Sequence, residues 1–317
     1  MTDQIPLEVP WGRKPEPDTV MGDADLSGKR VVLTGGYSGI GLEATKAFVS
    51  RGASVIIPAR SKEKAEAALA DVPNTTIGTL DLADVSSAKA FADSIMADGK
   101  PVDLLINNAG VMASPLSRIG NNWEGQFAVN HLGHFVLTQG LMPALLKATK
   151  PRVVALSSLA HRITPIIWDD VHFESSDYQK WVAYGQSKTA NALFARHLTK
   201  LHDSLEAFSV HPGGIMTDLQ RHLTLEEQVE RGWLAEDGSM PDAIKAFFKT
   251  PAQGTATTLW AAVSTMLDGK GGVYCEDCNI AAPAPDDDKG IFGVRRWACS
   301  DEDAERLWSV TEAMLAG

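Results

Sequence analysis

The sequence predicts an α/β fold, a doubly wound sheet of about seven mostly parallel strands with helices on both faces, in a single domain. Short apolar segments alternate with helical segments of roughly 10–15 residues, which indicates right-handed crossovers between parallel strands. A glycine-rich turn joins the first apolar segment to the helix that follows it. Hydrophobic residues make up 44% of the 317 residues, a globular composition with enough chain for a well-buried core.

The apolar segments that we expect to form strands are residues 30–34, 53–58, 76–80, 102–106, 152–156, 207–211 and 272–275. The helices expected between and after them cover residues 39–51, 62–70, 86–97, 121–148, 183–202 and 252–267. We expect the 121–148 helix to be interrupted near Gly133, Gly140 and Pro143.

The two ends of the chain have their own signals. Residues 1–27 contain several prolines and are expected to form an irregular arm along the body, before a single domain over residues 28–317. Ser300 and Asp303 form a capping-box-like start for a last helix. No linker composition separates any part of residues 28–317, so we expect one domain.

Charge excludes one class of function. The net charge of −11 and the pI of about 5.2 argue against binding to a nucleic-acid backbone, which needs a basic face. No signal peptide and no apolar run of about 18 residues is visible, so we expect no membrane anchor and a cytoplasmic protein.

The three cysteines do not form a disulfide framework. Cys275 and Cys278 make a Cys-x-x-Cys pair, but no second pair of ligands with metal-like spacing follows, so we expect no metal site. We expect Cys275, Cys278 and Cys299 to be structural, with a redox dithiol as the alternative.

The glycine-rich turn indicates a phosphate site. Gly35, Gly39 and Gly41 follow a strand and open a helix, where side chains would keep the backbone from approaching a pyrophosphate. The helix N-terminus supplies free N–H groups and a favourable dipole. The alternative is a tight turn that binds nothing.

The end of the second strand indicates which dinucleotide would bind. A carboxylate there would bond the ribose 2′-hydroxyl of NAD, but this strand is followed by Arg60 and Ser61. The planar guanidinium of Arg60 suits a 2′-phosphate, and Ser61 can add a hydroxyl. We therefore expect NADP(H) to be preferred over NAD(H), the alternative being a solvated arginine in a loop.

Tyr184 and Lys188 indicate proton transfer. They are four residues apart, so on a helix they lie one above the other. The ammonium is expected to lower the pKa of the phenol, which could then exchange a proton with an alcohol or a ketone. The alternative for a lone tyrosine is simple packing.

Several further motifs stand in a fixed order with these residues, and the ordered set resembles the short-chain dehydrogenase/reductase family over roughly residues 27–280. The motifs are Thr34-Gly35-x-x-x-Gly39-x-Gly41, Asp81, Asn107-Asn108-Ala109-Gly110, Asn130, Ser158, Tyr184-x-x-x-Lys188 and His211-Pro212-Gly213. The segments 130–135 and 157–161 and the C-terminal tail are similar to the retinol dehydrogenase and WW-domain oxidoreductase branch.

This resemblance implies a Rossmann-type fold and a catalytic tetrad of Asn130, Ser158, Tyr184 and Lys188. Tyr184 would be the general acid or base, and Ser158 would stabilise the substrate oxygen. Lys188 would hold the ribose, and the main-chain carbonyl of Asn130 would hold a water that extends the proton relay. The cofactor contacts implied are Gly35, Tyr37, Ser38, Gly39, Ile40, Gly41, Arg60, Ser61, Asp81, Leu82, Asn108, Ala109, Gly110, Tyr184, Lys188, Pro212, Gly213, Ile215 and Thr217.

The resemblance also implies a substrate lid over about residues 218–250 and self-pairing into a homodimer or homotetramer through the helices at 121–148 and 183–202. Apolar residues in the lid and in residues 159–183, among them Ile163, Ile166, Ile167, Trp168 and Trp181, suggest a lipophilic carbonyl or alcohol as substrate. The alternative function is an NADP-binding regulatory or redox-sensing protein with little catalysis. The intact tyrosine–lysine pair favours an enzyme, and its spacing disfavours an enoyl reductase.

Overall fold

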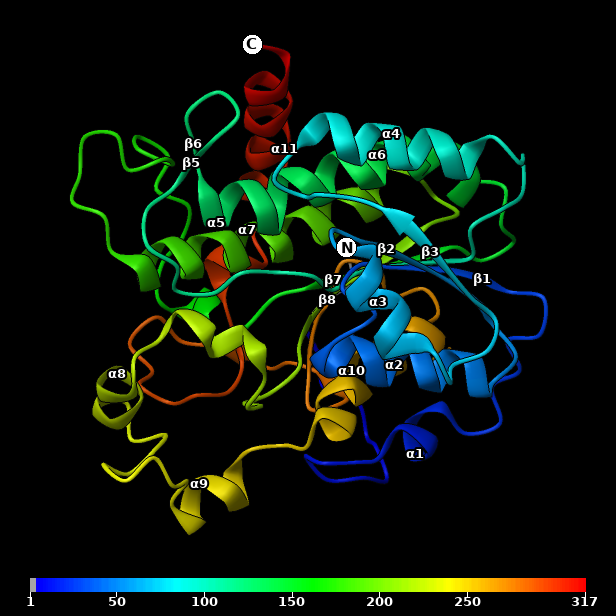
Figure 1. Ribbon diagram of the computed structural model, residues 1–317. Coiled ribbons are helices and arrows are strands. Elements are labelled where there is room, and N and C mark those ends of the chain that lie inside the picture. The colour runs from blue at the N-terminus through cyan, green and yellow to red at the C-terminus, as the bar shows by residue number, and fades with distance from the viewer. Residues whose placement is uncertain (1–3) are drawn as a thin grey trace.

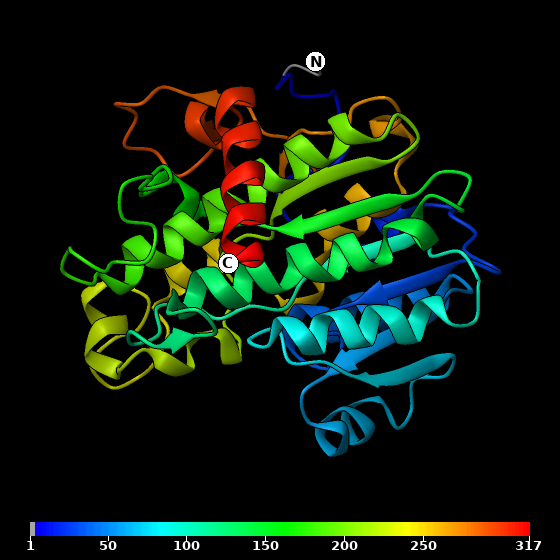
Figure 2. The same cartoon turned by 90° about the horizontal axis from the view of Figure 1, so that it is seen from above.

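A mostly parallel sheet runs through the middle of the computed structural model, which describes residues 4–317 (Figures 1 and 2). Within that range its eight strands lie in the order β10-β9-β8-β7-β4-β1-β2-β3, and only β10 is antiparallel to its neighbour. The strands are β1 (Arg30–Leu33), β2 (Ser54–Ala59), β3 (Thr75–Thr79), β4 (Leu104–Asn107), β7 (Arg152–Leu156), β8 (Glu206–His211), β9 (Tyr274–Glu276) and β10 (Asn279–Ile280). All seven predicted strands are present, and β10 was not predicted.

The order of the strands reverses between β1 and β4, because the chain first winds outward to β3 and then returns on the other side of β1. Open parallel sheets bind ligands at the carboxyl ends of the strands beside such a reversal. In Figure 2 the arrowheads of the strands point toward the side where the yellow-green segment around residue 225 lies. The predicted lid and the predicted cofactor turn therefore share one edge of the sheet.

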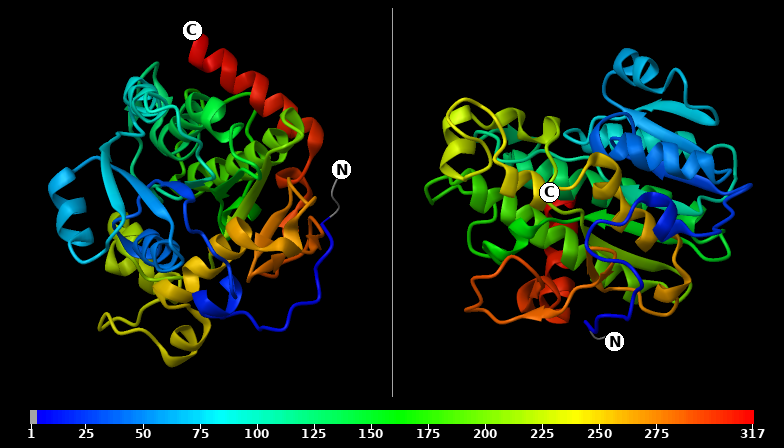
Figure 3. Two further views of the ribbon diagram at one scale, coloured as in Figure 1. Left: turned by 90° about the vertical axis from the view of Figure 1, so that its right-hand side faces the viewer. Right: turned by 90° about the horizontal axis from the view of Figure 1, so that it is seen from below.

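Helices cover both faces of the sheet, as expected. One layer holds α4 (Val85–Met96), α6 (Gly133–Leu145), α7 (Lys180–Leu201) and α11 (Asp301–Ala316). The other layer, seen from below in Figure 3, holds α1 (Pro17–Met21), α2 (Gly39–Ser50) and α10 (Pro251–Val263). In β1, Val31 belongs to the core under α2 and α10, and Val32 to the core under α4 and α6. Successive side chains of a strand point to opposite faces, so one apolar strand serves both cores.

The predicted helix over residues 121–148 differs in detail. It begins with β6 (Trp123–Glu124), α5 (Gly125–Phe127) and a π-helical turn (Ala128–Leu132), and α6 follows. Gly133 is the first residue of α6 and does not break the helix. A Cβ at this position would stand 2.3 Å from the carbonyl oxygen of Leu82. The glycine allows close packing, and the irregularity lies one turn earlier, at Asn130.

The C-terminal helix α11 lies against α6 and α7. The Trp308 ring packs 4.7 Å from the Phe135 ring and stacks on the Phe194 ring at 5.9 Å between centroids. Ser300 caps the helix as predicted, since its hydroxyl oxygen accepts a hydrogen bond from the Asp303 N–H at 3.1 Å. Part of the surface that we expected to pair with a second copy is therefore covered by this chain itself.

The N-terminal arm lies along the body, and its residues 1–3 fall outside the described residues. Figure 3 shows it crossing below α10 toward the hairpin of β9 and β10. Its main chain at Leu7 exchanges hydrogen bonds with the Asn279 amide, and the Trp11 indole N–H donates to the Cys278 carbonyl. The arm also forms the short helix α1, so it is less irregular than expected.

Three further short helices lie at the edges of the molecule. The lid region contains α8 (Leu225–Glu230) and α9 (Asp242–Phe247), which stand away from the sheet in Figure 1. Helix α3 (Lys62–Leu69) flanks the edge strand β3. Across residues 4–317 we find no helix whose length and apolar character would let it cross a bilayer.

Candidate active site

The glycine turn sits between β1 and α2. Gly35 and Gly39 adopt φ of +68° and +50°, a backbone region that favours glycine. A Cβ on Gly39 would face only the Thr217 side chain, at 3.5 Å, so its backbone is open on the ligand side. A Cβ on Gly41 would stand 2.2 Å from the Gly35 carbonyl oxygen. Gly41 is therefore required for packing the helix onto the turn, and its part in the approach of a pyrophosphate stays a prediction.

The start of α2 leaves its main-chain donors uncovered by its own cap. Ser38 has extended backbone at the N-cap position, but its side chain caps no N–H group. The free N–H groups and the helix dipole suit a phosphate. Tyr37 and Ile40, beside the turn, pack partly against the core under α2. The predicted contact residues therefore lie around one open helix end.

The loop after β4 is tied to the glycine turn through Thr34. The Asn108 and Ala109 N–H groups both donate to the Thr34 hydroxyl oxygen at 2.9 Å, and the Asn108 amide donates to the Thr34 carbonyl at 2.8 Å. Gly110 follows, and a Cβ there would lie 3.1 Å from Asn130 Oδ1 and 3.5 Å from Lys188 Nζ. This loop therefore contacts Thr34 of the glycine motif at one end and lies near the predicted catalytic residues Asn130 and Lys188 at the other.

The predicted selectivity residues lie at the ends of β2 and β3. Arg60 is exposed directly after β2. The Ser61 hydroxyl oxygen caps α3 by accepting from the Lys64 N–H, and the hydroxyl donates to Glu63 at 3.0 Å. Asp81 is half-buried, with one carboxylate oxygen on the Ala83 N–H, and Leu82 beside it is buried. Arg60 is thus free to meet a ligand, whereas Ser61 already has partners.

The tyrosine, the lysine and one serine come together at the carboxyl end of β7. Tyr184 and Lys188 are both almost fully buried on α7. A hydrogen bond with the Ser158 hydroxyl favours the phenolate of Tyr184. The neighbouring Ser157 instead donates to the Lys188 carbonyl at 2.7 Å. Of the two adjacent serines, the structure brings Ser158 to the phenol, and its catalytic role stays a prediction.

The pKa values in this site differ from the expected direction. Burial raises the pKa of Tyr184 to about 12, against the opposing hydrogen bond of Ser158, and burial lowers the pKa of Lys188 to about 7. The Lys188 ammonium nitrogen lies 5.6 Å from the centre of the Tyr184 ring and donates to the Leu156 carbonyl at 3.0 Å. The expected lowering of the tyrosine pKa by Lys188 is wrong for this arrangement, because desolvation raises that pKa and the opposing contribution comes from Ser158.

Asn130 is fully buried, and its side chain is committed to structure. Its amide oxygen accepts from the Val111 N–H, and its amide nitrogen donates to the Val111 carbonyl and the Ser187 hydroxyl, all at 2.9 Å. This leaves the main-chain carbonyl as the group able to act in the site. The imidazole Nδ1 of His134 lies 3.0 Å from that carbonyl oxygen.

The segment that follows β8, residues 212–217, also borders the site. Gly213 adopts φ of +102°, and Pro212 is half-buried next to it. Ile215 is buried and lies beside Ile40 over Gly254 of α10. Because the Thr217 side chain faces Gly39, this segment and the glycine turn border the same space.

Apolar side chains of the lid pack directly over the tyrosine. Met112, Leu219, Leu223 and Trp233 form a cluster with Tyr184, and the Trp181 ring meets the Tyr184 ring edge-on at 6.2 Å. Apolar residues of the segment 218–250 therefore border the tyrosine, and the role of this segment as a substrate lid stays a prediction.

Part of our pocket prediction is wrong. Ile166 and Trp168 pack with Trp123, Phe127 and Leu307 near α11, away from the cluster around the tyrosine. Ile163 is exposed. Of the segment 159–183, Trp181 is the aromatic residue that reaches the site, because it stands on the first turn of α7, three residues before Tyr184.

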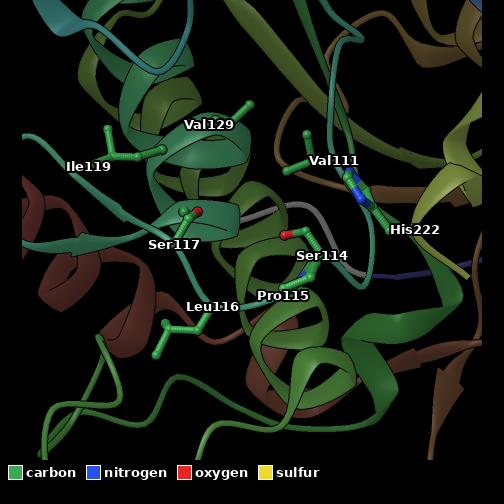
Figure 4. A pocket seen from close by; sticks show the side chains of 9 residues that line it. Val111, Ser114, Pro115, Leu116, Ser117, Ile119, Val129 and His222 are labelled. Atoms are coloured by element: carbon green, nitrogen blue, oxygen red, sulfur yellow. The ribbon is translucent and has the colours of Figure 1, made fainter.

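A pocket of about 290 Å³ opens beside this cluster (Figure 4). Figure 4 shows Val111 and His222 close together on one side and Ile119 and Val129 on the other. The lining is mainly apolar and consists of Val111, Ser114, Pro115, Leu116, Ser117, Ile119, Gly125, Val129 and His222. Met112 and Leu223, the chain neighbours of Val111 and His222, belong to the cluster around Tyr184, so the pocket adjoins that cluster.

The cysteines show the features of structural residues. Cys275 and Cys278 are buried as free thiols, and burial raises the pKa of Cys278 to about 11. A raised pKa suppresses the reactive thiolate. Within residues 4–317, no three His, Cys, Asp or Glu side chains are gathered in a way that could hold a metal ion.

Sequence analysis gave no role to Thr34 and His134, although Thr34 stands in the glycine motif. The structure joins them, since His134 Nε2 lies 2.9 Å from the Thr34 hydroxyl oxygen. The available signal was the spacing of Asn130 and His134, four residues apart and hence on one face of a helix. Thr34 gave no such signal because its partners come from distant segments.

Comparison with known proteins agrees with this geometry. A model of the family described as short chain dehydrogenase matches residues 29–228. A Streptomyces lividans protein described as a probable oxidoreductase is 40% identical over 291 residues, which cover 90% of this chain and 96% of that protein. Human retinol dehydrogenase 12 is 36% identical over 301 residues, covering 92% and 88%.

A solved structure, of an uncharacterised protein from Mycobacterium Paratuberculosis, matches with a TM-score of 0.68 and 30% identity, covering 96% of each chain. The family model alone spans more than half of this chain. The chain therefore belongs to the short-chain dehydrogenase/reductase family, in its retinol dehydrogenase-like branch, and is an oxidoreductase enzyme of the kind that acts on CH–OH and C=O groups.

Proposed function

We propose that this enzyme interconverts a lipophilic ketone or aldehyde and the corresponding alcohol, with NADP(H) as cofactor. The observation that carries the proposal is the meeting of Ser158, Tyr184 and Lys188 at the same sheet edge as the open glycine turn. A hydride donor and a proton donor must both reach one carbonyl group. At this edge the open glycine turn supports binding of the hydride donor, and Tyr184 is the proposed proton donor.

The proposed roles follow from the contacts. Tyr184 gives a proton to the carbonyl oxygen in reduction and takes it back in oxidation. Its high pKa keeps it protonated at neutral pH, which suits the reductive direction. Ser158 donates to the developing alkoxide. Lys188 lies near Tyr184 in the proton relay and binds the ribose hydroxyls. Its lowered pKa lets its amine lose and regain a proton near neutral pH.

The proposed cofactor site fits the residues present. The open backbone at Gly39 and the uncapped start of α2 suit a pyrophosphate. Asp81 and the Asn108–Gly110 loop line the adenosine and ribose sides. When bound, the nicotinamide supplies or accepts the hydride. Arg60, exposed and at the end of β2, supports a preference for the 2′-phosphate of NADP(H).

The proposed substrate class rests on the apolar cluster over Tyr184 and on the pocket beside it. A carbonyl group at the tyrosine would have Met112, Leu223 and Trp233 around its neighbouring carbons. The pocket of about 290 Å³ would then hold a further apolar part of the molecule. A small, charged sugar would leave both surfaces without a partner.

The remaining predictions concern location and assembly. We keep a cytoplasmic location as a proposal, and we modify the expectation of a dimer or tetramer. Pairing through α6 and α7 must involve α11, because Trp308 covers Phe135 and Phe194. Sedimentation of the chain tests this, since a mass of 34.0 kDa in solution would exclude stable pairing.

The experiment that tests the function is an NADPH-oxidation screen over carbonyl compounds graded by size and polarity. We expect turnover of apolar ketones or aldehydes and poor turnover of sugars. Asn130→Ala is not a suitable control in this screen. Its lost side chain would also release the Val111 N–H group, which donates to the Asn130 amide oxygen. A preference for small, charged sugars would overturn the substrate class, and no oxidation of NADPH with any carbonyl would overturn the function.

A further inference from the structure

We propose that His134 is a positioning residue of this site, which fixes the main-chain carbonyl of Asn130 and couples it to the cofactor loop. The inference rests on the proposed function, because it concerns the proton relay of the same site. It adds a residue with a defined tautomer and a defined donor atom. The contacts of the imidazole ring carry it.

His134 bridges two elements with its two ring nitrogens. Nδ1 lies 3.0 Å from the Asn130 carbonyl oxygen on the preceding turn, and Nε2 lies 2.9 Å from the Thr34 hydroxyl oxygen at the end of β1. The ring is almost fully buried. Its neighbour along the helix, the Thr138 hydroxyl, donates to the His134 carbonyl at 2.7 Å and so holds the main chain of that turn.

Only one uncharged tautomer satisfies all of these groups. A carbonyl oxygen can only accept, so Nδ1 carries the proton and donates to Asn130. Nε2 is then an acceptor, and the Thr34 hydroxyl donates to it. The Thr34 oxygen accepts from the Asn108 and Ala109 N–H groups, at 2.9 Å each, which fills its two acceptor positions. Its own proton is left to donate, and His134 Nε2 at 2.9 Å is nearer than the Ile106 carbonyl at 3.4 Å. Burial lowers the pKa of His134 to about 4, so the ring stays neutral in this network.

The network matters because of where the carbonyl stands. Asn130 lies within the π-helical turn, where the hydrogen-bond pattern of the helix is displaced by one residue. A carbonyl oxygen has two acceptor lobes, so the bond from His134 leaves one for a further donor such as water. Lys188 is close to Asn130, since a Cβ on Gly110 would stand 3.1 Å from Asn130 Oδ1 and 3.5 Å from Lys188 Nζ. The imidazole thus fixes the direction of an acceptor beside the catalytic lysine.

His131, on the same π-helical turn, separates this role from simple packing. It is equally buried, and its Nε2 lies 2.9 Å from the Thr311 hydroxyl of α11. Its ring packs among Phe127, Phe135 and Phe194, all outside the site. Replacing His131 therefore disturbs the same helix without touching the Asn130 carbonyl.

Two isosteric variants separate the two ring nitrogens. His134→Asn keeps a donor where Nδ1 stands and loses the bond to Thr34, whereas His134→Gln places its amide where Nε2 stands and loses the bond to Asn130. We expect His134→Gln to lower kcat roughly tenfold, with KM for the carbonyl little changed and a larger solvent deuterium isotope effect. His134→Asn should stay within about threefold of wild type.

The controls are His131→Asn and a measurement that needs no turnover. His131→Asn should lower the melting temperature as the His134 variants do, with kcat unchanged. In wild type, ¹⁵N NMR of the histidines should show His134 with a protonated Nδ1 and no titration between pH 5 and 8. Equal kcat losses in His134→Asn and His134→Gln, a loss in His131→Asn, or a protonated Nε2 would each overturn the inference.

The proposed function is tested separately in the same series. If wild type reduces carbonyls and Tyr184→Phe does not, the function stands, and the kinetic variants test His134 alone. If wild type reduces none, the function falls. In that case the tautomer of His134 from NMR still decides whether the hydrogen-bond network is as described.

Discussion

The half of the site that would hold the cofactor and the half that would hold the substrate are built in different ways. On the cofactor side the determining contacts involve the main chain, as where a Cβ on Gly41 would meet the Gly35 carbonyl at 2.2 Å. On the substrate side they are between side chains far apart in sequence. Arg13 of the N-terminal arm lies over the rings of Phe247 and Phe292, at 4.8 and 4.5 Å, and pairs with Asp277.

This difference teaches which part of the site tolerates change. A turn fixed by backbone shape depends on a few glycines, and any side chain there disturbs it at once. A wall fixed by distant side chains can be rebuilt by exchanging those side chains, since its backbone makes fewer demands. Lys14 shows the same dependence on the arm, because its ammonium donates to the carbonyls of Ala246 and Phe248 at the base of the lid.

Lys188 stands where the two halves meet, and we expect the largest energetic effect from its removal. Its folded pKa of about 7 lies below the ordinary 10.5, so between these values the unfolded chain binds more protons and wild-type stability rises with pH. The penalty is full below pH 7 and is at most roughly 5 kcal/mol. Lys188→Met should therefore be more stable than wild type at pH 6, although inactive.

Urea unfolding of both proteins at pH 6 and pH 9 measures this effect. The stability advantage of Lys188→Met should shrink as the pH rises. A stability advantage that does not change with pH would show that burial does not lower the pKa of Lys188. The contrast between the cofactor half and the substrate half would then lose its support at this residue.

Gly41→Ala tests the cofactor half by its backbone. The added methyl would clash with the Gly35 carbonyl and move the turn, and a displacement of about 1 Å costs roughly 100-fold in kcat/KM. NADPH binding by fluorescence titration should weaken together with kcat/KM. Gly12→Ala is the matched control, because a Cβ there meets nothing within 4 Å. Equal behaviour of the two variants would contradict the backbone account.

Arg60→Ala tests the cofactor half by its charge. Loss of a charged partner of a phosphate should raise KM for NADPH roughly tenfold and leave KM for NADH nearly unchanged. Steady-state kinetics with both cofactors measures the ratio. If both KM values rise equally, Arg60 does not read the 2′-phosphate, and the preference for NADP(H) has no basis in this residue.

Arg13→Ala tests the substrate half from a distance. Removing the guanidinium frees the base of the lid, and we expect a loss of roughly threefold to tenfold in kcat/KM for the carbonyl, with NADPH binding unchanged. Arg51→Ala serves as control, since Arg51 pairs with the exposed Asp18 away from the lid. A change in NADPH affinity, and none in carbonyl kinetics, would place the arm with the wrong half.

The smallest effect is expected in the pocket. Ser114→Trp should fill part of the space of about 290 Å³ and lower kcat/KM for large carbonyl compounds by roughly threefold to tenfold, while small ones react as before. Ser114→Ala keeps the space and is the control. A substrate panel gives the answer, and an equal loss for large and small compounds would remove the pocket from the substrate site.

What the sequence predicts well follows local rules. Strand β1 and helix α2 are predictable from an apolar run, a glycine turn and a helical period. The choice of Ser158 over Ser157 came from the resemblance to the family, and local rules could not predict that Ser157 donates instead to the Lys188 carbonyl. The tight hairpin from β9 to β10 was missed because Cys278, at positive φ, stands after Asp277 where such turns favour glycine.

What the sequence predicts poorly depends on distant contacts. Trp168 and Trp181 both lie between Ser158 and Tyr184 in the sequence, yet one packs near α11 and the other beside Tyr184. The pKa values of Tyr184 and Lys188 depend on burial, which sequence spacing does not report. The π-helical turn at Asn130 is followed by Gly133, whose close approach to the Leu82 carbonyl is a contact between distant segments that no local propensity encodes.

The most direct test of the central claim is a single-turnover measurement on Tyr184→Phe with bound NADPH. Loss of the proton donor should slow NADPH oxidation by roughly 100-fold or more, while NADPH affinity stays near that of wild type. That result would show that Tyr184 supplies the proton at the point where the two halves meet. NADPH oxidation at the wild-type rate in Tyr184→Phe would contradict the account.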